Sequence, residues 1–164
     1  MQIAYFAGGC FWCITPILRD MPGVVGVTSG YSGGTEKDPT YEDVKHQRTG
    51  HRETIRVEFD EALVSFETLL ETFFGGVDLF DDGGQFIDRG HSYTLAVYYT
   101  DDRQRIAAQK AMVAVEAAFG QKPCVALAPF TAFYEAEEYH QNYDLKNPEE
   151  FRRELVESGR KKEV

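Results

Sequence analysis

The sequence predicts a single α+β domain, built as a two-layer α/β sandwich with a mixed sheet. Its 164 residues match the length of one ordinary domain. Hydrophobic residues make up 43% of the chain, which is enough to bury a core without a metal or a disulfide scaffold. Strand and helix patterns are mixed without the strict alternation of a parallel α/β fold, and no internal repeat or low-complexity block divides them.

The N-terminal part of the chain predicts a strand, a helix and a second strand. Residues 2–7 are apolar, and the two glycines that follow end this strand. Residues 10–20 then have a helical pattern. Pro16 allows a second starting point for this helix, because a proline after a threonine also fits the first helical position. In that case, the residues before Pro16 would form an irregular turn. Residues 24–31 predict the second strand, followed by a Gly-rich turn.

The middle of the chain contains the clearest alternation. In residues 52–59 the last three odd-numbered positions are apolar, which predicts a strand with one face in contact with water. Ser65 can cap a helix that ends at the glycine pair 75–76. Residues 78–90 form an acidic, Gly-rich loop, and residues 92–100 predict a strand because they are rich in β-branched and aromatic side chains.

The last third of the chain predicts three helices and one strand. Residues 101–118 predict a long helix that begins at two aspartates and is closed by Gly120. Residues 124–127 predict a further strand. Residues 137–143 and 148–157 predict two shorter helices.

Charge and composition disfavour several classes of partner. The net charge of −10 disfavours nucleic acid and anionic membranes, which both attract Lys and Arg. No apolar run approaches the ~20 residues of a membrane span, and the N-terminus shows no secretory signal. We expect a cytoplasmic monomer, with one domain over residues 1–157 and a frayed tail over residues 158–164.

The three cysteines, Cys10, Cys13 and Cys124, are too few for a disulfide scaffold. In a reducing compartment, a close cysteine pair is more often catalytic or metal-binding than structural. Cys10 and Cys13 form such a pair within the run Gly-Gly-Cys-Phe-Trp-Cys. Cys124 precedes a predicted interior strand, and we expect it to be buried and inert.

Cys10 is expected at the start of a helix, beside free backbone N–H groups and the positive end of the helix dipole. That environment lowers the pKa of a thiol from ~8.5 towards neutrality. Cys13 follows three residues later on the same helical face, so the two cysteines could form a disulfide across one turn.

Other interpretations of this pair stay open. Free cysteines are often small buried hydrophobic residues. A zinc site would need further ligands, and the four histidines are scattered along the chain. A C-x-x-C motif at a helix start is also typical of thioredoxin-like disulfide exchange. Phe11 and Trp12, between the two cysteines, either fill core space or line a small apolar pocket beside the thiol.

Six blocks of sequence resemble one enzyme family. Residues 9–12, Gly-Cys-Phe-Trp, resemble the signature of peptide methionine sulfoxide reductases of the A type. Five further blocks of this family are matched in the same order. They are residues 30–34, 39–42, 49–53, 88–90 with Tyr93, and the last block, 129–130 with 133–137 and 139–141. The resemblance covers residue 3 to about residue 151, and the order of the blocks makes it highly specific.

The resemblance implies reduction of the S epimer of methionine sulfoxide, in proteins and as the free amino acid. Cys10 would attack the sulfoxide sulfur, and Glu53 would donate a proton to the sulfoxide oxygen. The hydroxyls of Tyr41 and Tyr93 would hydrogen-bond that oxygen, and Asp88 would orient the site. A sulfoxide oxygen leaves badly unless it is protonated, so the thiolate needs an acid opposite it. Glu53 can hold a proton at neutral pH only if burial raises its pKa above the usual ~4.3.

The same resemblance implies that Phe11 and Trp12 cradle the terminal methyl group of the substrate. Cys10 would become a sulfenic acid, with which a second thiol must condense. Many relatives carry resolving cysteines near the C-terminus, but residues 151–164 contain none. We therefore expect a disulfide between Cys10 and Cys13 that a thioredoxin-type partner reduces, with no metal or other cofactor. If Cys13 points away from Cys10, an external thiol would resolve the sulfenic acid.

Overall fold

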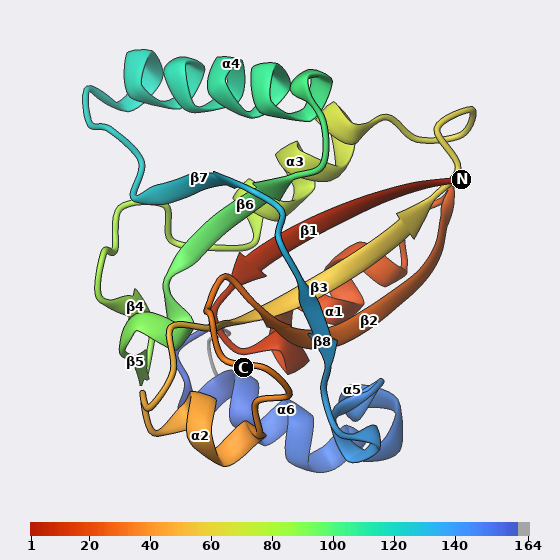
Figure 1. The fold of residues 1–164 in the computed structure, drawn as a ribbon, viewed down its shortest axis with the longest axis vertical. Helices are drawn as coiled ribbons and strands as arrows, with labels where there is room; N and C mark the ends of the chain where they lie inside the picture. Colours follow the sequence, from red (N-terminus) through yellow and green to blue (C-terminus); the bar gives the residue numbers. More distant parts are fainter. Residues whose placement is uncertain (161–164) are drawn as a thin grey trace.

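A mixed, six-stranded sheet forms the centre of the fold (Figure 1). The structure, a computed structural model, describes residues 1–160. The strands lie in the order β7-β6-β1-β3-β2-β8; β6 and β7 are parallel, and the other neighbours are antiparallel. Their bounds are β1 Gln2–Gly8, β2 Val24–Ser32, β3 Arg52–Phe59, β6 Leu95–Tyr99, β7 Val125–Pro129 and β8 Phe133–Glu135. A separate two-stranded sheet pairs β4 Gly84–Gln85 with β5 Asp88–Arg89.

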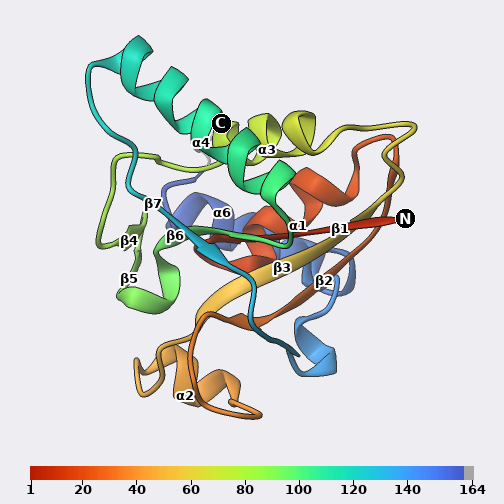
Figure 2. The same ribbon diagram turned by 45° about the horizontal axis from the view of Figure 1, so that its top comes forward.

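Helices cover one face of the sheet and both ends of the molecule. Helix α1 packs against β2 and β3, and α3 packs against α1 and α4. Figures 1 and 2 both place α3 and α4 at one end of the molecule and α2 at the opposite end. The bounds are α1 Phe11–Arg19, α2 Tyr41–Lys45, α3 Phe66–Gly75, α4 Asp102–Phe119, α5 Tyr143–Lys146 and α6 Pro148–Glu157, with 3₁₀ turns at His91–Tyr93 and Glu138–His140.

Two hydrophobic clusters lie on opposite faces of the sheet. The larger one joins the sheet to α1 and α3, and in it the rings of Phe6 and Phe73 stack 4.8 Å apart. The smaller one includes Tyr5 and Tyr98, and the ring of Phe130 stacks on Tyr5 at 4.0 Å. Phe130 belongs to the connection from β7 to β8. This connection therefore covers the second face of the sheet and brings β8 to the edge beside β2.

The predicted single-domain α+β fold with a mixed sheet is confirmed. The strand over residues 52–59 and the helix over residues 148–157 have the predicted bounds. Strand β6 begins at Leu95, later than expected, because a 3₁₀ turn precedes it. Helix α2 and strand β8 are not predicted from the sequence, since each has five residues or fewer.

Helix α1 begins directly after Cys10, so the alternative start at Pro16 is wrong. Pro16 lies inside the helix, although it has no N–H to donate to the preceding turn. The hydroxyl of Thr15 does not cap a later helix. It donates instead to the carbonyl of Phe11 at 2.7 Å, one turn back along the same helix.

The helix predicted over residues 137–143 is wrong. The chain forms one 3₁₀ turn there, and Asn142 then adopts a left-handed conformation with φ 51° before α5 begins. Tertiary hydrogen bonds replace the helical ones. The side-chain oxygen of Gln141 accepts the Ser29 N–H at 2.8 Å, and its nitrogen donates to the Ser29 carbonyl at 2.9 Å. This exchange fixes the segment against β2.

The first residues of the expected C-terminal tail contact the rest of the fold. The N–H of Ile87 donates to the Ser158 carbonyl at 3.2 Å. Arg160 donates from Nη2 to the Gly8 carbonyl at 3.0 Å. Residues 161–164 of that tail lie outside the described residues. The proposed extent of the domain, residues 1–157, stays a prediction.

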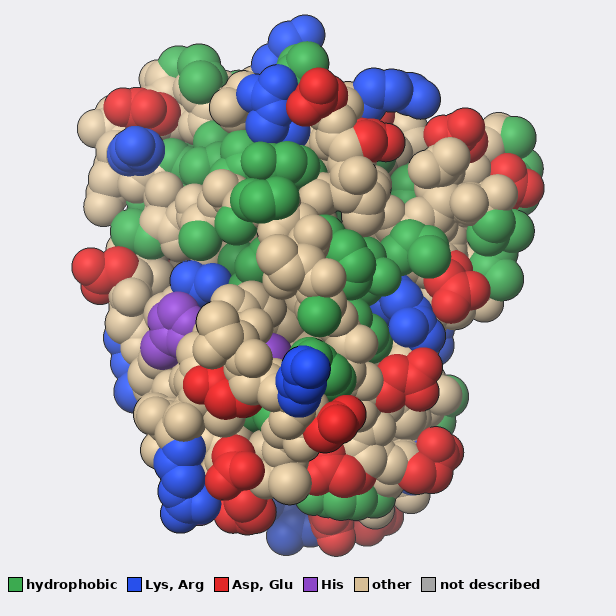
Figure 3. Space-filling model, viewed as in Figure 1, with side chains coloured by type: hydrophobic (Ala, Val, Ile, Leu, Met, Phe, Trp, Pro, Cys, Tyr) green, Lys and Arg blue, Asp and Glu red, His purple; other side chains and the backbone are tan. Residues whose placement is uncertain are grey.

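The surface agrees with the acidic composition. Figure 3 shows Asp and Glu side chains gathered at the lower edge of the molecule, where Figure 1 places α2 and α6. Within residues 1–160, no helix is long and apolar enough to cross a membrane.

Candidate active site

Cys10 lies between the end of β1 and the start of α1. Gly9, which precedes it, has a φ of 85°, a value that glycine adopts without strain. The carbonyl of Cys10 accepts the N–H of Cys13 at 3.0 Å, which closes the first turn of the helix. Cys10 is half-buried, Cys13 is buried, and both are free thiols. The geometry thus brings together the two cysteines that the sequence pairs.

Glu53 lies in the interior, on the face of β3 that packs against α1. Its side chain is 1% exposed, and Oε1 accepts the Phe11 N–H at 3.1 Å. Burial raises the pKa of Glu53 to about 8, and the charges of Asp88 and Cys13 act in the same direction. The Phe11 N–H and a hydrogen bond with Tyr93 oppose that rise in pKa. Glu53 is therefore a protonated acid at neutral pH, next to the start of α1.

Tyr41 and Tyr93 come from different elements, and both lie near Glu53 and Cys10. Tyr41 is the first residue of α2, and Tyr93 ends the 3₁₀ turn before β6. Burial raises the pKa of both phenols, and the charges of Glu53 and Cys10 raise these pKa values further. Both hydroxyls therefore stay protonated and can act as hydrogen-bond donors.

Asp88 is half-buried in β5, and its charge raises the pKa values of Cys10, Glu53 and Tyr93. Burial raises the pKa of Asp88 itself, while the cations Arg160 and Lys45 lower it. The predicted residues Cys10, Cys13, Glu53, Tyr41, Tyr93 and Asp88 thus form one electrostatically connected cluster.

The two residues between the cysteines take different positions. Phe11 is fully buried, and its ring packs against Tyr31 and Tyr41. Trp12 is half-buried and stacks on Tyr143, with ring centres 3.9 Å apart and an angle of 9° between the ring planes. Its Nε1 donates to Nδ1 of His140 at 3.0 Å. Phe11 and Trp12 therefore contribute to an aromatic wall beside Cys10.

His140 is the polar centre of this aromatic wall. It is 1% exposed, and its ring lies 4.3 Å from that of Tyr41 and 5.2 Å from that of Phe11. Burial lowers the pKa of His140 to about 4. Its imidazole is therefore neutral at physiological pH, and Nδ1 is free to accept the Trp12 N–H.

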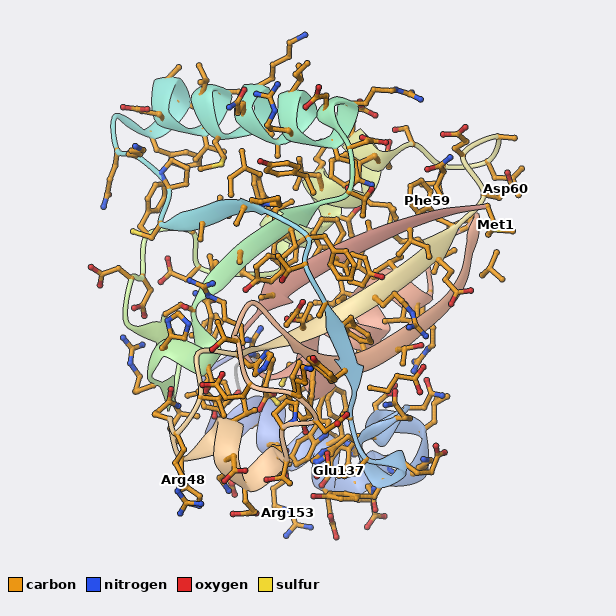
Figure 4. All side chains as sticks on the ribbon, in the orientation of Figure 1. Met1, Arg48, Phe59, Asp60, Glu137 and Arg153 are labelled. Atoms are coloured by element: carbon orange, nitrogen blue, oxygen red, sulfur yellow. The ribbon has the colours of Figure 1, made fainter. Side chains whose placement is uncertain are left out.

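Glu137 joins two elements of the wall with its two carboxylate oxygens. Oε1 accepts the hydroxyl of Tyr31 at 2.9 Å, and Oε2 accepts the backbone N–H of Tyr41 at 3.1 Å. Figure 4 shows Glu137 beyond the end of β8, next to α2. Glu137 thus fixes the start of α2, on which Tyr41 lies, to the end of β2.

The thiol pKa values differ from the sequence-based expectation. The hydrogen bond between the two thiols raises the pKa of Cys10 and lowers that of Cys13. Burial and the charges of Glu53 and Asp88 also raise the pKa of Cys10. The expected lowering of the Cys10 pKa is therefore opposed by groups that the helix start alone does not reveal. The charge of Glu53 is absent when that acid is protonated, so this opposition weakens below pH 8.

Comparison with known proteins identifies the family. Residues 2–164 match the family described as "Peptide methionine sulfoxide reductase". The chain is 42% identical to the peptide methionine sulfoxide reductase MsrA of Bacillus licheniformis, over 97% of this chain and 89% of that protein. It is 42% identical to the protein of the same name from Bacillus subtilis, over 97% and 91%. The chain belongs to the peptide methionine sulfoxide reductase family. It is an oxidoreductase of this type.

Solved structures agree with this peptide methionine sulfoxide reductase fold. The reduced form of Mxr1 from Saccharomyces cerevisiae has a TM-score of 0.85 at 28% identity, covering 90% of this chain and 86% of that one. Methionine sulfoxide reductase A of Corynebacterium diphtheriae has a TM-score of 0.81 at 28% identity, covering 90% and 75%.

Several residues at the site of this peptide methionine sulfoxide reductase were not predicted from the sequence as site residues. They are Tyr31, Glu137, His140, Tyr143 and Arg160. The first three lie in blocks that resemble the family, which is the one signal that could have indicated them. Arg160 lies outside every block, and only the path of the folded chain brings it to Gly8.

Cys124 and the zinc hypothesis are the remaining sequence-based expectations. Cys124 is half-buried, not buried, because β7 lies at the edge of the sheet. Its N–H donates to the Leu79 carbonyl. Within residues 1–160, no group of three or more His, Cys, Asp or Glu side chains is arranged to hold a metal ion.

Proposed function

We propose that this enzyme reduces the S epimer of methionine sulfoxide, in proteins and as the free amino acid, with Cys10 as nucleophile. The observation that supports this proposal is the buried Glu53, whose pKa of about 8 keeps it protonated one hydrogen bond away from the residue after Cys10. Disulfide exchange needs no such acid. Transfer of a sulfoxide oxygen does, because an unprotonated oxygen is a poor leaving group.

In the first step, the Cys10 sulfur attacks the sulfoxide sulfur. Glu53 protonates the oxygen, and the hydroxyls of Tyr41 and Tyr93 donate to it as its negative charge develops. The sulfur–oxygen bond of the substrate breaks and the oxygen passes to Cys10. The net change is thiol plus sulfoxide to sulfenic acid plus thioether, so the substrate gains the two electrons that the Cys10 sulfur loses.

Substrate positioning is the proposed role of the aromatic wall. The Trp12 ring is held on one face by Tyr143 and at its edge by His140. This leaves an apolar surface of fixed orientation beside Cys10, suited to the methyl group of the sulfoxide. Phe11 supports it from the buried side, and Asp88 orients the polar side of the site.

In the second step, Cys13 condenses with the sulfenic acid on Cys10. Cys13 loses its proton, the sulfur–sulfur bond forms, the sulfur–oxygen bond breaks, and the oxygen leaves as hydroxide, which takes up a proton to become water. The proximity of the two cysteines, which the bond from the Cys13 N–H to the Cys10 carbonyl joins within one turn, supports this assignment. A dithiol then reduces the disulfide by exchange.

A thioredoxin-type protein is the proposed reductant. Mxr1 from Saccharomyces cerevisiae has been observed in complex with Trx2, in a form with a TM-score of 0.57 and 20% identity to this chain. The disulfide between Cys10 and Cys13 would lie at the start of α1, where Cys10 is half-buried.

The reaction is tested with a racemic mixture of the two sulfoxide epimers of a blocked methionine and dithiothreitol as reductant. Chiral chromatography follows each epimer separately. We expect loss of the S form alone, no loss with Cys10→Ser, and normal loss with Cys124→Ser as the matched thiol control. Loss of neither epimer, together with reduction of insulin disulfides, would replace the proposal with disulfide exchange.

The resolving role of Cys13 has its own test. Cys13→Ser should release one methionine per chain in a single turnover and then stop with thioredoxin, because the sulfenic acid on Cys10 persists. Dimedone should label Cys10 in this variant. Full thioredoxin-driven turnover by Cys13→Ser would show that an external thiol resolves the sulfenic acid.

A further inference from the structure

Arg160 occupies a defined place next to the cysteine pair. Its Nη2 donates to the Gly8 carbonyl at 3.0 Å, and its Nη1 lies 3.5 Å from the Gly76 carbonyl. The guanidinium lies over the ring of Phe86, 4.8 Å from its centre. Two backbone carbonyls and one aromatic face therefore hold this cation where β1 ends, two residues before Cys10.

A cavity connects Arg160 to Cys13. Its volume is about 450 Å³, and both residues line it. Phe151 and Leu155, on the inner side of α6, form part of its apolar wall. Cys10 does not line this cavity. Arg160 and Cys13 therefore line one cavity that does not include Cys10, and beside its apolar walls a charge acts more strongly than in bulk water.

The charged groups around Cys13 act in opposite directions. Asp88 and Glu154 are carboxylates that raise the pKa of Cys13, and Arg160 is a cation that lowers it. The other neighbours that ionise are Cys10, which shares its hydrogen bond, and Glu53. Within residues 1–160, no carboxylate forms an ion pair with Arg160, so none of these carboxylates neutralises its charge by direct contact.

The state of the pair changes during catalysis. In the resting enzyme, the hydrogen bond with the Cys10 thiol is the largest effect that stabilises a Cys13 thiolate. Under the proposed function, that thiol is replaced by a sulfenic acid before Cys13 must attack. Arg160 is then the cation that remains beside Cys13 at the moment of disulfide formation.

We propose that Arg160 is a positioning residue for the second half-reaction, in which its guanidinium stabilises the Cys13 thiolate as this attacks the sulfenic acid of Cys10. The thiolate electron pair forms the sulfur–sulfur bond. The oxygen leaves Cys10 as hydroxide and takes up a proton to become water. The inference rests on the proposed function, because it assigns Arg160 to the step that Cys13 performs.

The first test separates the two half-reactions in a single turnover of Arg160→Gln. Release of methionine should slow less than disulfide formation, because Arg160 acts directly on Cys13 and reaches the first half-reaction only through Asp88. A pKa rise of one unit reduces the thiolate fraction about tenfold below the pKa, and the greater nucleophilicity of the more basic thiolate restores about threefold. Disulfide formation should therefore slow about threefold at pH 7 and become equal or faster at high pH. Arg160→Lys should recover part of the rate at pH 7.

The second test measures the ionisation of the Cys13 thiol in the absence of substrate. In a Cys10→Ser, Cys124→Ser background, Cys13 is the one remaining thiol, and its alkylation by iodoacetamide is measured against pH. Arg160→Gln should move the midpoint up by about one pH unit. Arg153→Gln is the matched control, since it removes the same charge from an exposed position on α6 (Figure 4).

Two results would overturn the assignment of Arg160. One is an alkylation midpoint that does not move in Arg160→Gln. The other is disulfide formation that is slower by one factor at every pH, which would indicate a structural role. If Cys13→Ser keeps thioredoxin-driven turnover, the proposed resolving step itself fails, and the alkylation midpoint distinguishes that outcome from a failure of Arg160.

Discussion

The side-chain oxygen Oε1 of Glu53 accepts the backbone N–H of Phe11 at 3.1 Å, across 42 residues of sequence. This hydrogen bond joins the central strand β3 to the first residue of α1. It orients the buried acid towards the residue that follows Cys10. The same carboxyl lies where burial makes its charged form costly, so the hydrogen bond fixes the place of Glu53, while burial, against the effect of that bond, keeps it protonated.

The buried acid should make stability depend on pH. Folded Glu53 holds its proton up to a pKa of about 8, whereas an unfolded glutamate loses it near a pKa of ~4.3. The folded state therefore binds more protons between these values, and its free energy of unfolding falls as pH rises through that window. Glu53→Gln removes this loss, so the variant should be more stable than the parent above pH 8. Urea unfolding at pH 5 and pH 9 measures the difference.

Glu53→Gln should lower activity, although it raises stability above pH 8. Glu53→Gln cannot donate the proton, so single-turnover release of methionine should fall by about 10²- to 10⁴-fold. Release by the parent enzyme should fall as pH rises through about 8, since the acid form of Glu53 is lost there. Glu58→Gln, on the opposite face of the same strand, is the control and should change neither property. A stability difference that is the same at both pH values would contradict the account of Glu53.

His140 should produce a slope of the opposite sign. Its folded pKa is about 4, below the unfolded value of ~6.5, so its stabilising contribution is lost as pH falls through that range. Between pH 4.5 and 6.5, the effects of His140 and Glu53 should offset each other in the parent protein. His140→Phe leaves the Glu53 effect uncompensated, so its free energy of unfolding should fall as pH rises over this range.

The same variant should weaken substrate binding. His140→Phe removes the acceptor for the Trp12 N–H, so the Trp12 ring loses one of its two supports. KM for a blocked methionine sulfoxide should rise by more than kcat falls. The exposed His46→Phe is the matched control. A parent-like stability slope and KM in His140→Phe would show that His140 does not support the wall.

The burial of Glu53 is contained in the sequence pattern. Position 53 is in phase with Ile55 and Val57, so the alternation that predicts an inward face for these residues also points Glu53 inward. By composition alone, a charged residue at the start of a strand is expected to be solvated. The family blocks indicate the role, and the period of the strand indicates the burial.

The aromatic wall could not be assembled from local patterns. Glu137 and His140 follow a three-residue strand, β8, whose pairing with β2 depends on the crossing segment that contains Phe130. In the segment after β8, the side chain of Gln141 forms hydrogen bonds with Ser29 in place of helical ones, so the periodicity that predicts a helix is misleading. Such contacts join residues more than 100 positions apart, and no local propensity encodes them.

The close approach of β8 to β2 should make Gly30 sensitive to substitution. A Cβ at Gly30 would lie 2.5 Å from the Tyr134 carbonyl and would also collide with the Phe133 ring. Gly30→Ala should therefore force β8 away and cost about 1–3 kcal/mol of stability. Gly26, on the same strand, has no atom within 4 Å of such a Cβ. Gly26→Ala is the matched control, and urea unfolding compares the two.

Separation of β8 should also affect the site. The segment after β8 carries Glu137, which holds the backbone of Tyr41. In the absence of urea, where Gly30→Ala is still folded, its KM should be higher than that of the parent. Gly26→Ala should keep the parent KM. Equal stability and equal KM in the two variants would show that β8 tolerates the displacement.

The ion pair of Arg19 with Asp144 should control the position of Tyr143 without taking part in the chemistry. Arg19 donates from Nη1 to Oδ1 at 2.9 Å and from Nη2 to Oδ2 at 2.8 Å, and the side chains are 19% and 11% exposed. This pair joins the end of α1 to α5, where Tyr143 stacks on Trp12. Arg19 lowers the pKa of Asp144, so the contribution of the pair is present at neutral pH and is lost as pH falls below ~4.

Asp144→Asn should lower the free energy of unfolding by about 1–3 kcal/mol at pH 7, because it leaves a half-buried guanidinium without its charged partner. The difference from the parent should shrink below pH 4. KM should rise as Tyr143 loosens, while single-turnover release of methionine at saturating substrate keeps its rate. Asp20→Asn is the matched control, since Asp20 contacts the same Arg19 but is 70% exposed. A slower saturated rate with an unchanged KM would place the ion pair in the chemical step and not in the support of the aromatic wall.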